Sequence, residues 1–154
     1  MIKVYIAGKW SHKKLMKYFI DSCSKHFLIT HDWTITEQEG KNTPDDMHNF
    51  ALMDVDGVKN ANVLIIIVSD STYPYRGTCT EMGIALGLNT KILVLDLCND
   101  SAFRKNIFTH HKNVKYMKHP VDMASLENLE DDETKEKATK LINLVVDEVL
   151  TLMH

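Results

Sequence analysis

Residues 62–69 read Asn-Val-Leu-Ile-Ile-Ile-Val-Ser, an unbroken apolar run between two polar residues. A run of this length and β-branched composition is typical of a strand, and it is too short to cross a membrane as a helix. Because the run has no polar face, it predicts a strand that is buried on both sides. Such strands lie at the centre of parallel sheets that helices cover on both faces.

Four further apolar runs predict the remaining strands. They are rich in β-branched or aromatic residues and cover residues 2–7, 27–30, 91–97 and 114–117. Helical patterns separate these runs, and the alternation of strands with helices implies a parallel sheet. We therefore predict a single domain over residues 1–154 of the α/β class, a flavodoxin-like doubly wound sheet of five parallel strands in the order 2-1-3-4-5.

Helix start signals support the same alternation. Thr43 is a good N-cap, Pro44 suits the first helical position, and the aspartates that follow complement the helix dipole. We expect this helix to run to Asn60. Ser11 is expected to cap the first helix. The later helices are expected over residues 78–88 and 133–152, with loops at residues 34–42 and 73–77.

The composition restricts the classes of function. The hydrophobic share is 44%, the charged share is 25% and the formal net charge is −3, which argues against nucleic acid and anionic membranes as partners. The three cysteines have no metal-ligand spacing and are expected to be reduced thiols. No signal peptide is recognisable at the start. We therefore expect a soluble, cytoplasmic protein that binds no nucleic acid, membrane, metal or cofactor.

Glu81 is the most unusual residue, because it is the only charged side chain in residues 77–90. By helical spacing it shares one apolar stripe with Ile84, Ala85 and Leu88. A carboxylate is rarely buried without a partner or a function, since removing the charge from water is costly. The sequence also allows a structural role, in which Glu81 stabilises the first helical turn or forms a capping box with Thr78.

Asp54 is a second carboxylate on an apolar stripe, which it shares with Met47, Phe50, Ala51, Val58 and Ala61. Its structural alternative is a bond to backbone amides or to an arginine. Two carboxylates in one cleft suit glycosidic chemistry, where one attacks the anomeric carbon and the other protonates the leaving group. Tyr5 can hold a carboxylate through its hydroxyl, or it can be an ordinary strand aromatic. The catalytic candidates are Glu81, Asp54 and Tyr5.

Ligands of doubly wound sheets bind beyond the carboxyl ends of the strands. This rule places the site in the loops at residues 8–11, 31–34 and 70–77. Lysines at a helix start can hold a phosphate, aromatic rings can stack on a base, and helix-start amides can face a ligand. The same residues also fit a solvated helix start, ordinary loop packing and a surface arginine. The substrate-binding candidates are Gly8, Lys9, Trp10, Ser11, Trp33, Tyr75, Arg76, Gly77 and Thr78.

Several motifs point to one family. They are KVYIAG at residues 3–8, Asp54 with Gly57 and Ala61, RGT at residues 76–78, EMGIA at residues 81–85 and NIFTHH at residues 106–111. Together they resemble the motifs of the nucleoside 2-deoxyribosyltransferases. The resemblance covers roughly residues 2–114 and is strongest between residues 54 and 95.

The resemblance implies a role for each catalytic candidate. Glu81 attacks the anomeric carbon, releases the base and carries a deoxyribosyl ester, while Asp54 contacts the base and helps to protonate it. Tyr5 orients Glu81. The substrate is a small nucleoside or nucleotide, and the family implies homo-oligomerisation. Transferases pass the sugar to a second base, whereas related hydrolases pass it to water, often from a nucleoside 5′-monophosphate.

Both outcomes remain open from the sequence. Transferases often carry another aspartate several residues before the glutamate, where this chain reads TYPYR at residues 72–76. The lysines between residues 9 and 13 favour a monophosphate and hence the hydrolase. We take nucleoside 2-deoxyribosyltransferase as the leading hypothesis and deoxynucleoside 5′-monophosphate N-glycosidase as the alternative. A non-catalytic nucleotide-sensing module and, by fold analogy, cleavage of a dinucleotide are further alternatives.

Overall fold

The computed structural model describes residues 1–154, and its five strands form a single sheet. All neighbouring strands are parallel, and their order is β2-β1-β3-β4-β5, which confirms the predicted flavodoxin-like topology. The strands are β1 (Lys3–Ala7), β2 (Leu28–Ile29), β3 (Val63–Val68), β4 (Lys91–Asp96) and β5 (Val114–Lys118).

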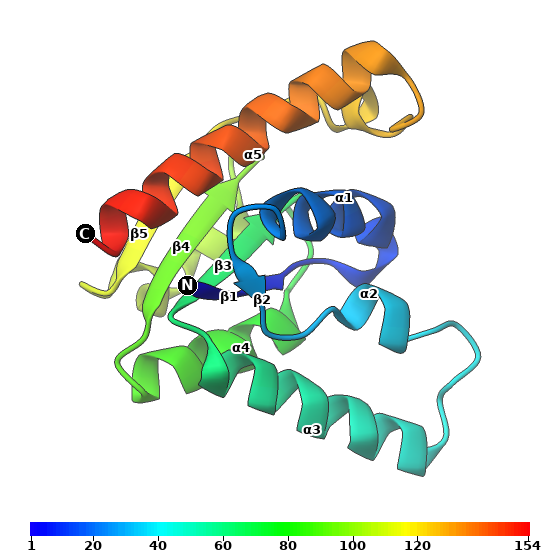
Figure 1. Ribbon diagram of the computed structural model, residues 1–154, viewed down its shortest axis with the longest axis vertical. Helices are drawn as coiled ribbons and strands as arrows, with labels where there is room; N and C mark the ends of the chain where they lie inside the picture. The colour runs from blue at the N-terminus through cyan, green and yellow to red at the C-terminus, as the bar shows by residue number, and fades with distance from the viewer.

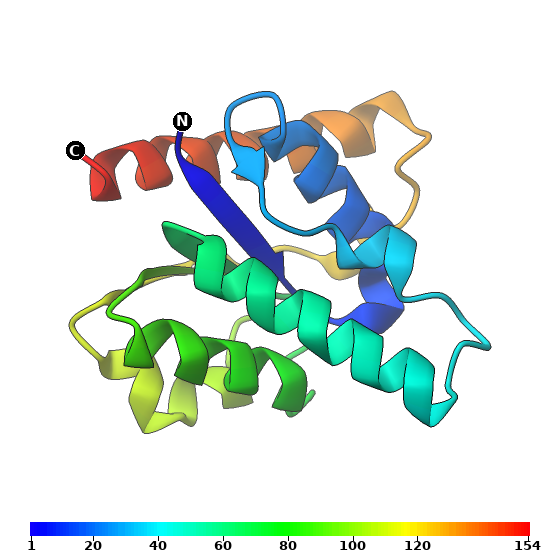
Figure 2. The same cartoon turned by 60° about the horizontal axis from the view of Figure 1, so that its bottom comes forward.

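Helices cover both faces of the sheet, as Figure 1 and Figure 2 show: α1 and α5 lie on one face, and α3 and α4 lie on the other. The α-helices are α1 (Lys13–Cys23), α2 (Trp33–Thr36), α3 (Pro44–Asn60), α4 (Arg76–Gly87) and α5 (Asp132–Leu152). Four short 3-10 helices complete the chain: η1 (Trp10–His12), η2 (Ala102–Lys105), η3 (Ile107–His110) and η4 (Met123–Leu126). None of the helices is long and apolar enough to span a membrane.

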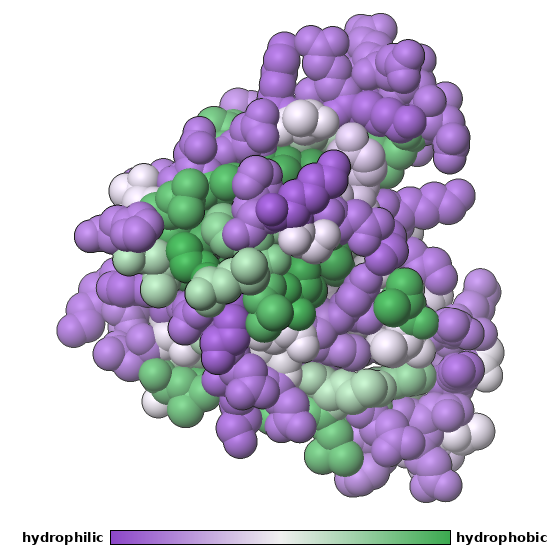
Figure 3. All heavy atoms as spheres, viewed as in Figure 1, coloured by the Kyte–Doolittle hydropathy of each residue, from purple (hydrophilic) through white to green (hydrophobic).

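The central strand β3 is the best-buried element of the fold. All six of its residues are fully buried between β1 and β4, as the apolar run predicted. Burial of one such side chain contributes roughly 1.5–3 kcal/mol, so this strand anchors the sheet. The core is one cluster of 36 buried residues. Figure 3 shows hydrophilic residues around most of the periphery and hydrophobic ones in the middle of that face.

The start of α3 follows the predicted signals closely. The Thr43 hydroxyl accepts a hydrogen bond from the Asp46 amide at 3.1 Å, and the Asp46 carboxylate accepts one from the Thr43 amide, which forms a capping box. Pro44 occupies the first turn, as expected. The prediction for Ser11 was wrong, because residues 10–12 form η1 and α1 begins after His12 without a side-chain cap.

The predicted apolar stripes are partly wrong. Met47 is 55% exposed, Leu88 is 51% exposed, and Ala51 is also exposed, so these positions are not part of the core. The more buried residues of α3 include Phe50, Asp54, Gly57 and Val58. Two boundaries also differ: α2 (Trp33–Thr36) overlaps the expected loop at residues 34–42, and α4 begins at Arg76.

Candidate active site

A cavity of about 160 Å³ lies at the carboxyl end of β1 and β3, the edge where this topology binds ligands. Its walls come from β1, the α2 region, α3, the loop after β3 and the start of α4. The lining residues are Tyr5, Gly8, Trp10, Trp33, Glu37, Asp54, Tyr73, Tyr75, Gly77, Thr78 and Glu81.

The structure brings most of the sequence candidates to this cavity. The three catalytic candidates line it, together with Gly8, Trp10, Trp33, Tyr75, Gly77 and Thr78. Three binding candidates do not line it. Lys9 forms an ion pair with Asp70 at 2.7 Å, Ser11 lines a separate cavity beside α1, and Arg76 is exposed. No Lys or Arg side chain is left among the lining residues.

Glu81 reaches the cavity because the start of α4 is fixed against the end of β3. The hydroxyl of Tyr75 accepts hydrogen bonds from the amides of Ser69 at 2.8 Å and Asp70 at 3.1 Å. Tyr75 has a φ of 51°, a left-handed conformation that turns the chain into the helix. No acidic residue lies in the first turn of α4, and Tyr75 rather than Thr78 is the N-cap. Both structural alternatives for Glu81 are therefore wrong.

The pKa of the Glu81 carboxyl lies close to physiological pH. Burial raises its pKa to about 7, the hydrogen bond from Tyr5 acts in the opposite direction, and the charge of Asp54 adds to the rise. Burial and the nearby charges of Glu81 and Asp54 raise the pKa of Tyr5 far above its ordinary value. Tyr5 thus remains a hydrogen-bond donor to Glu81.

Asp54 is brought to the cavity by a close approach of α3 to β1. A Cβ atom on Gly57 would lie 2.8 Å from the Tyr5 ring and 2.9 Å from Cβ of His31, so only glycine allows this contact. The Thr30 hydroxyl donates to the Gly57 carbonyl at 2.7 Å and fixes the same contact. Asp54 Oδ1 is buried without a hydrogen-bond partner, 3.5 Å from His31 Nε2.

Glu37 also lines the cavity, and the sequence analysis missed it. Its amide donates to the Trp33 carbonyl at 3.0 Å, and its carbonyl accepts from Trp10 Nε1 at 3.2 Å. Burial first, and then the neighbouring Asp54 carboxyl, raise the pKa of the Glu37 carboxyl to about 9. Its Oε1 atom is buried without a hydrogen-bond partner.

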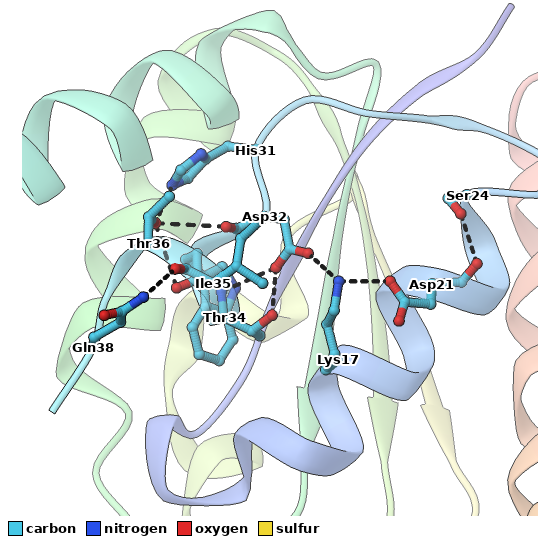
Figure 4. Close-up of polar contacts among 10 residues, drawn as sticks. Lys17, Asp21, Ser24, His31, Asp32, Thr34, Ile35, Thr36 and Gln38 are labelled. Atoms are coloured by element: carbon cyan, nitrogen blue, oxygen red, sulfur yellow. Dashed lines mark hydrogen bonds and ion pairs between the residues drawn. The ribbon is translucent and has the colours of Figure 1, made fainter.

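The α2 turn explains why Glu37 points inward, and it offered a signal that was not used. Asp32 is the N-cap, and its carboxylate accepts from the Thr34 amide at 3.0 Å and from Lys17 at 2.8 Å. Figure 4 shows Lys17 between Asp32 and Asp21, which ties the turn to α1. Asp32 followed by Thr34 is a pattern typical of a helix N-cap and predicts a helical turn after Asp32. Glu37 then lies at the C-terminal end of that turn.

The arrangement suits the cleavage of a bond between a sugar and a base. The Glu81 carboxylate has the chemistry of a nucleophile, and Glu37 and Asp54 offer further acidic groups in the same cavity. Tyr73, Trp10 and Trp33 supply aromatic walls. No group of three or more His, Cys, Asp or Glu residues is placed to hold a metal ion.

Comparison with known proteins identifies the family. The family model described as Nucleoside 2-deoxyribosyltransferase matches residues 4–145. The chain belongs to the nucleoside 2-deoxyribosyltransferase family. Family members act on nucleosides or nucleotides, so cleavage of N-glycosidic bonds is the general chemistry of this chain. Among curated proteins, no match to the chain is found.

Two solved structures share the fold of this nucleoside 2-deoxyribosyltransferase family member. The Clostridium botulinum CMP N-glycosidase BcmB is 19% identical with a TM-score of 0.50, over 90% of this chain and 97% of that one. A phosphoheptose isomerase from Francisella tularensis is 14% identical with a TM-score of 0.57, over 95% of this chain and 74% of that one. Identities this low show a common fold and carry no reaction with them.

Proposed function

We propose that this protein is a nucleoside 2-deoxyribosyltransferase that works through a covalent ester on Glu81. The ionised carboxyl of Glu81 attacks the anomeric carbon, the bond from that carbon to the base breaks, and its electron pair leaves with the base. A second base then attacks the same carbon and displaces Glu81. The observation that carries the proposal is the half-buried Glu81 carboxyl, which lies beside Tyr5 in a cavity with aromatic walls.

The charges around the cavity favour a neutral nucleoside over a nucleotide as the substrate. Three carboxyl groups line the cavity, those of Glu37, Asp54 and Glu81, and no lysine or arginine does. Lys9, the nearest candidate for a phosphate, is held by Asp70 at 2.7 Å and lies over the Tyr73 ring at 4.8 Å. A 5′-phosphate inside the cavity would therefore meet carboxyl groups, and no lysine or arginine among the lining residues would balance its charge.

One observation favours the alternative, a deoxynucleoside 5′-monophosphate N-glycosidase. Gly77 and Thr78 line the cavity at the start of α4, and no side chain caps that helix. Amides in the first turn of a helix have no partner within the helix and bind phosphates well. A protein of similar fold, BcmB, is named a CMP N-glycosidase, which supports the monophosphate in this alternative, although CMP contains ribose.

The deciding experiment follows base release from deoxynucleosides and from their 5′-monophosphates, with and without a second free base. A new nucleoside that forms only when base is added would support the transferase. Free base from monophosphates alone would support the hydrolase. Acid quenching followed by mass spectrometry should find a deoxyribosyl group on the peptide that contains Glu81.

The controls compare Glu81→Ala with Glu39→Gln, because Glu39 is an exposed glutamate outside the cavity. Base release should disappear in Glu81→Ala and persist in Glu39→Gln. Unchanged release by Glu81→Ala would contradict the mechanism. A folded wild type that shifts its melting temperature with nucleotides but releases no base would favour the non-catalytic sensing module.

We further propose that the chain self-associates and works in the cytoplasm. Self-association is implied by the family and is supported by apolar side chains that are exposed on α3, after α4 and on η3: Met47, Leu52, Val55, Leu88, Ile107 and Phe108. Sedimentation of wild type and Leu52→Lys tests it, since the lysine should favour monomers. The three unpaired cysteines support a reducing compartment.

A further inference from the structure

Two buried oxygen atoms at the bottom of the active-site cavity have no hydrogen-bond partner. They are Glu37 Oε1 and Asp54 Oδ1, and they are the only buried side-chain oxygen or nitrogen atoms of the described chain in that state. More than nine in ten buried polar groups in proteins are hydrogen-bonded, so an orphan atom needs an explanation. Both residues line the same cavity and their carboxyl groups are neighbours, so a proton shared between the two carboxyls accounts for the missing partners.

No lysine or arginine among the lining residues balances this pair. Glu81 lies near it on α4, Tyr5 lies near it on β1, and His31 approaches from the end of β2 with Nε2 3.5 Å from Asp54 Oδ1. The pair is partly buried, and two adjacent carboxyls repel each other when both are ionised, which favours one proton on the pair.

The amide and the carbonyl of Glu37 both form hydrogen bonds, which fix the backbone from which its side chain projects. The Glu37 amide donates to Trp33 at 3.0 Å, and Trp10 donates to the Glu37 carbonyl at 3.2 Å. Both tryptophans are also walls of the cavity. The acid and the aromatic walls therefore form one unit, and a base that lies against the walls lies beside the acid.

We infer that Glu37 is a catalytic residue that donates the proton taken up by the departing base, with Asp54 as the positioning residue that keeps this proton on Glu37. This inference rests on the proposed function. In this mechanism Glu81 is the nucleophile and Glu37 is the acid. The rate that Glu37 contributes then depends on whether the leaving group needs a proton to depart.

The atoms balance in both half-reactions. In the first, a Glu81 oxygen bonds to the anomeric carbon, the bond from that carbon to the base breaks, and its electron pair stays on the base. The Glu37 proton moves to a ring nitrogen or carbonyl oxygen of that base, which leaves Glu37 ionised. In the second, the incoming base gives a proton to Glu37 as its nitrogen displaces the Glu81 ester. The pair then returns to its starting state.

The test uses two substrates that share the sugar and differ in the leaving group. A deoxynucleoside needs a proton on its base, whereas 4-nitrophenyl 2-deoxyriboside releases a stable phenolate without one. Glu37→Gln keeps the size of the side chain and removes the acid. We expect kcat with the deoxynucleoside to fall by roughly 10²–10⁴-fold and kcat with the aryl riboside to change only a few-fold. Glu37→Asp should recover part of the lost rate.

Glu39→Gln is the matched control, because Glu39 lies two residues away on the exposed part of the same segment. It should leave both rates unchanged. An equal fall of both rates in Glu37→Gln would overturn the inference, since a structural role affects the two substrates alike. No fall with the deoxynucleoside would also overturn it.

An infrared spectrum separates this inference from the proposed function. At pH 8 the wild type should show the carbonyl band of a protonated carboxyl that is missing in Glu37→Gln, whether or not the protein turns over a substrate. Absence of that band would overturn the assignment of the proton to Glu37. A wild type that shows the band and releases no base from any substrate would overturn the reaction, and the proton transfer with it.

Discussion

Acidic side chains lie in two places at the same edge of the sheet, and their pKa values shift in opposite directions. Beyond β3, Asp70 binds the Lys9 ammonium at 2.7 Å and accepts from the Thr72 amide at 3.0 Å. These partners, the lysine first, lower the pKa of the Asp70 carboxyl to about 2. In the adjoining cavity, Glu37 and Glu81 meet no cation, and burial raises their pKa values to about 9 and about 7.

The difference between the two sites comes from burial as well as from the available partners. Asp70 is partly exposed and is held by a lysine and an amide, so it stays ionised. Glu37 and Glu81 lie where burial and neighbouring carboxyls, without a lysine or arginine, raise their pKa values. Perturbed acids of the second kind are typical of active sites. By this comparison Asp70 has the properties of a structural acid, whereas Glu37 and Glu81, at the same edge of the sheet, have those of active-site acids.

The largest expected effect comes from Glu81→Gln. Loss of the nucleophile should reduce base release by roughly 10³-fold or more, because the covalent step cannot occur. The measurement is kcat with a deoxynucleoside, beside Asp70→Asn as the variant of the structural acid. A rate for Glu81→Gln within tenfold of wild type would remove Glu81 from the mechanism.

The same substitution should stabilise the protein at neutral and alkaline pH. The folded pKa of Glu81 is raised above its ordinary value of 4.5, so stability is lost as the pH rises from there through about 7. Glu81→Gln removes that loss, which is at most about 3 kcal/mol at 1.36 kcal/mol per pKa unit. Urea unfolding at pH 5 and pH 8 checks it: the gain should be present at pH 8 and small at pH 5.

The pH dependence of the reaction gives the next largest effect. Glu81 must be ionised to attack, and Glu37 must be protonated to donate, so kcat/KM should be highest between about pH 7 and about pH 9. Outside this window it should fall about tenfold per pH unit. In Glu37→Gln the fall on the alkaline side should disappear. An alkaline limb that survives in this variant belongs to another group.

Gly57→Ala tests the packing that brings Asp54 to the cavity. The new methyl group would lie 2.8 Å from the Tyr5 ring, so α3 must move away from β1, at a cost of about 1–3 kcal/mol in unfolding free energy. Base release should fall with it, because Asp54 moves with the helix. Gly83→Ala on α4 is the control, since nothing lies within 4 Å of its added Cβ and helix propensity favours alanine.

Asp70→Asn should have the smallest effect. Its folded pKa is lowered, so its contribution to stability is present above the ordinary aspartate pKa and is lost as the pH falls through about 2. The pair is partly exposed, and such pairs contribute less than about 1 kcal/mol. Thermal unfolding at pH 7 and pH 2 measures the difference between variant and wild type. A loss of several kcal/mol at pH 7 would contradict the classification of Asp70 as a satisfied surface acid.

The fold was predictable because its signals are local. The apolar run at residues 62–69 identified the central strand, and the capping residues before Pro44 identified the start of α3. Alternation of strands and helices then restricted the topology to a few possibilities. Exact helix boundaries were less accessible: α4 begins at Arg76 because the Tyr75 hydroxyl binds two backbone amides, a contact that no local pattern reveals.

The acidic residues of the candidate site were predictable only where a charge interrupted an apolar pattern. Glu81 and Asp54 stood out for that reason, and the cavity contains both. Glu37 did not, because Gln38, Glu39 and Lys41 surround it with polar neighbours that resemble a solvated loop. In the folded chain Glu37 lies beside Asp54 and Glu81, and its carbonyl accepts a hydrogen bond from Trp10, which is 27 residues away in the sequence. Long-range contacts of that kind need the folded structure.

The two tryptophans of the chain give the site an optical property of its own. Trp10 is 36% exposed and Trp33 is 4% exposed, and both border the cavity. An aromatic base that stacks on Trp10 shields its indole from water and quenches its fluorescence, while Trp33 emits from a constant apolar setting. Binding at this site can thus be followed by intrinsic fluorescence, without a label and before any bond is broken.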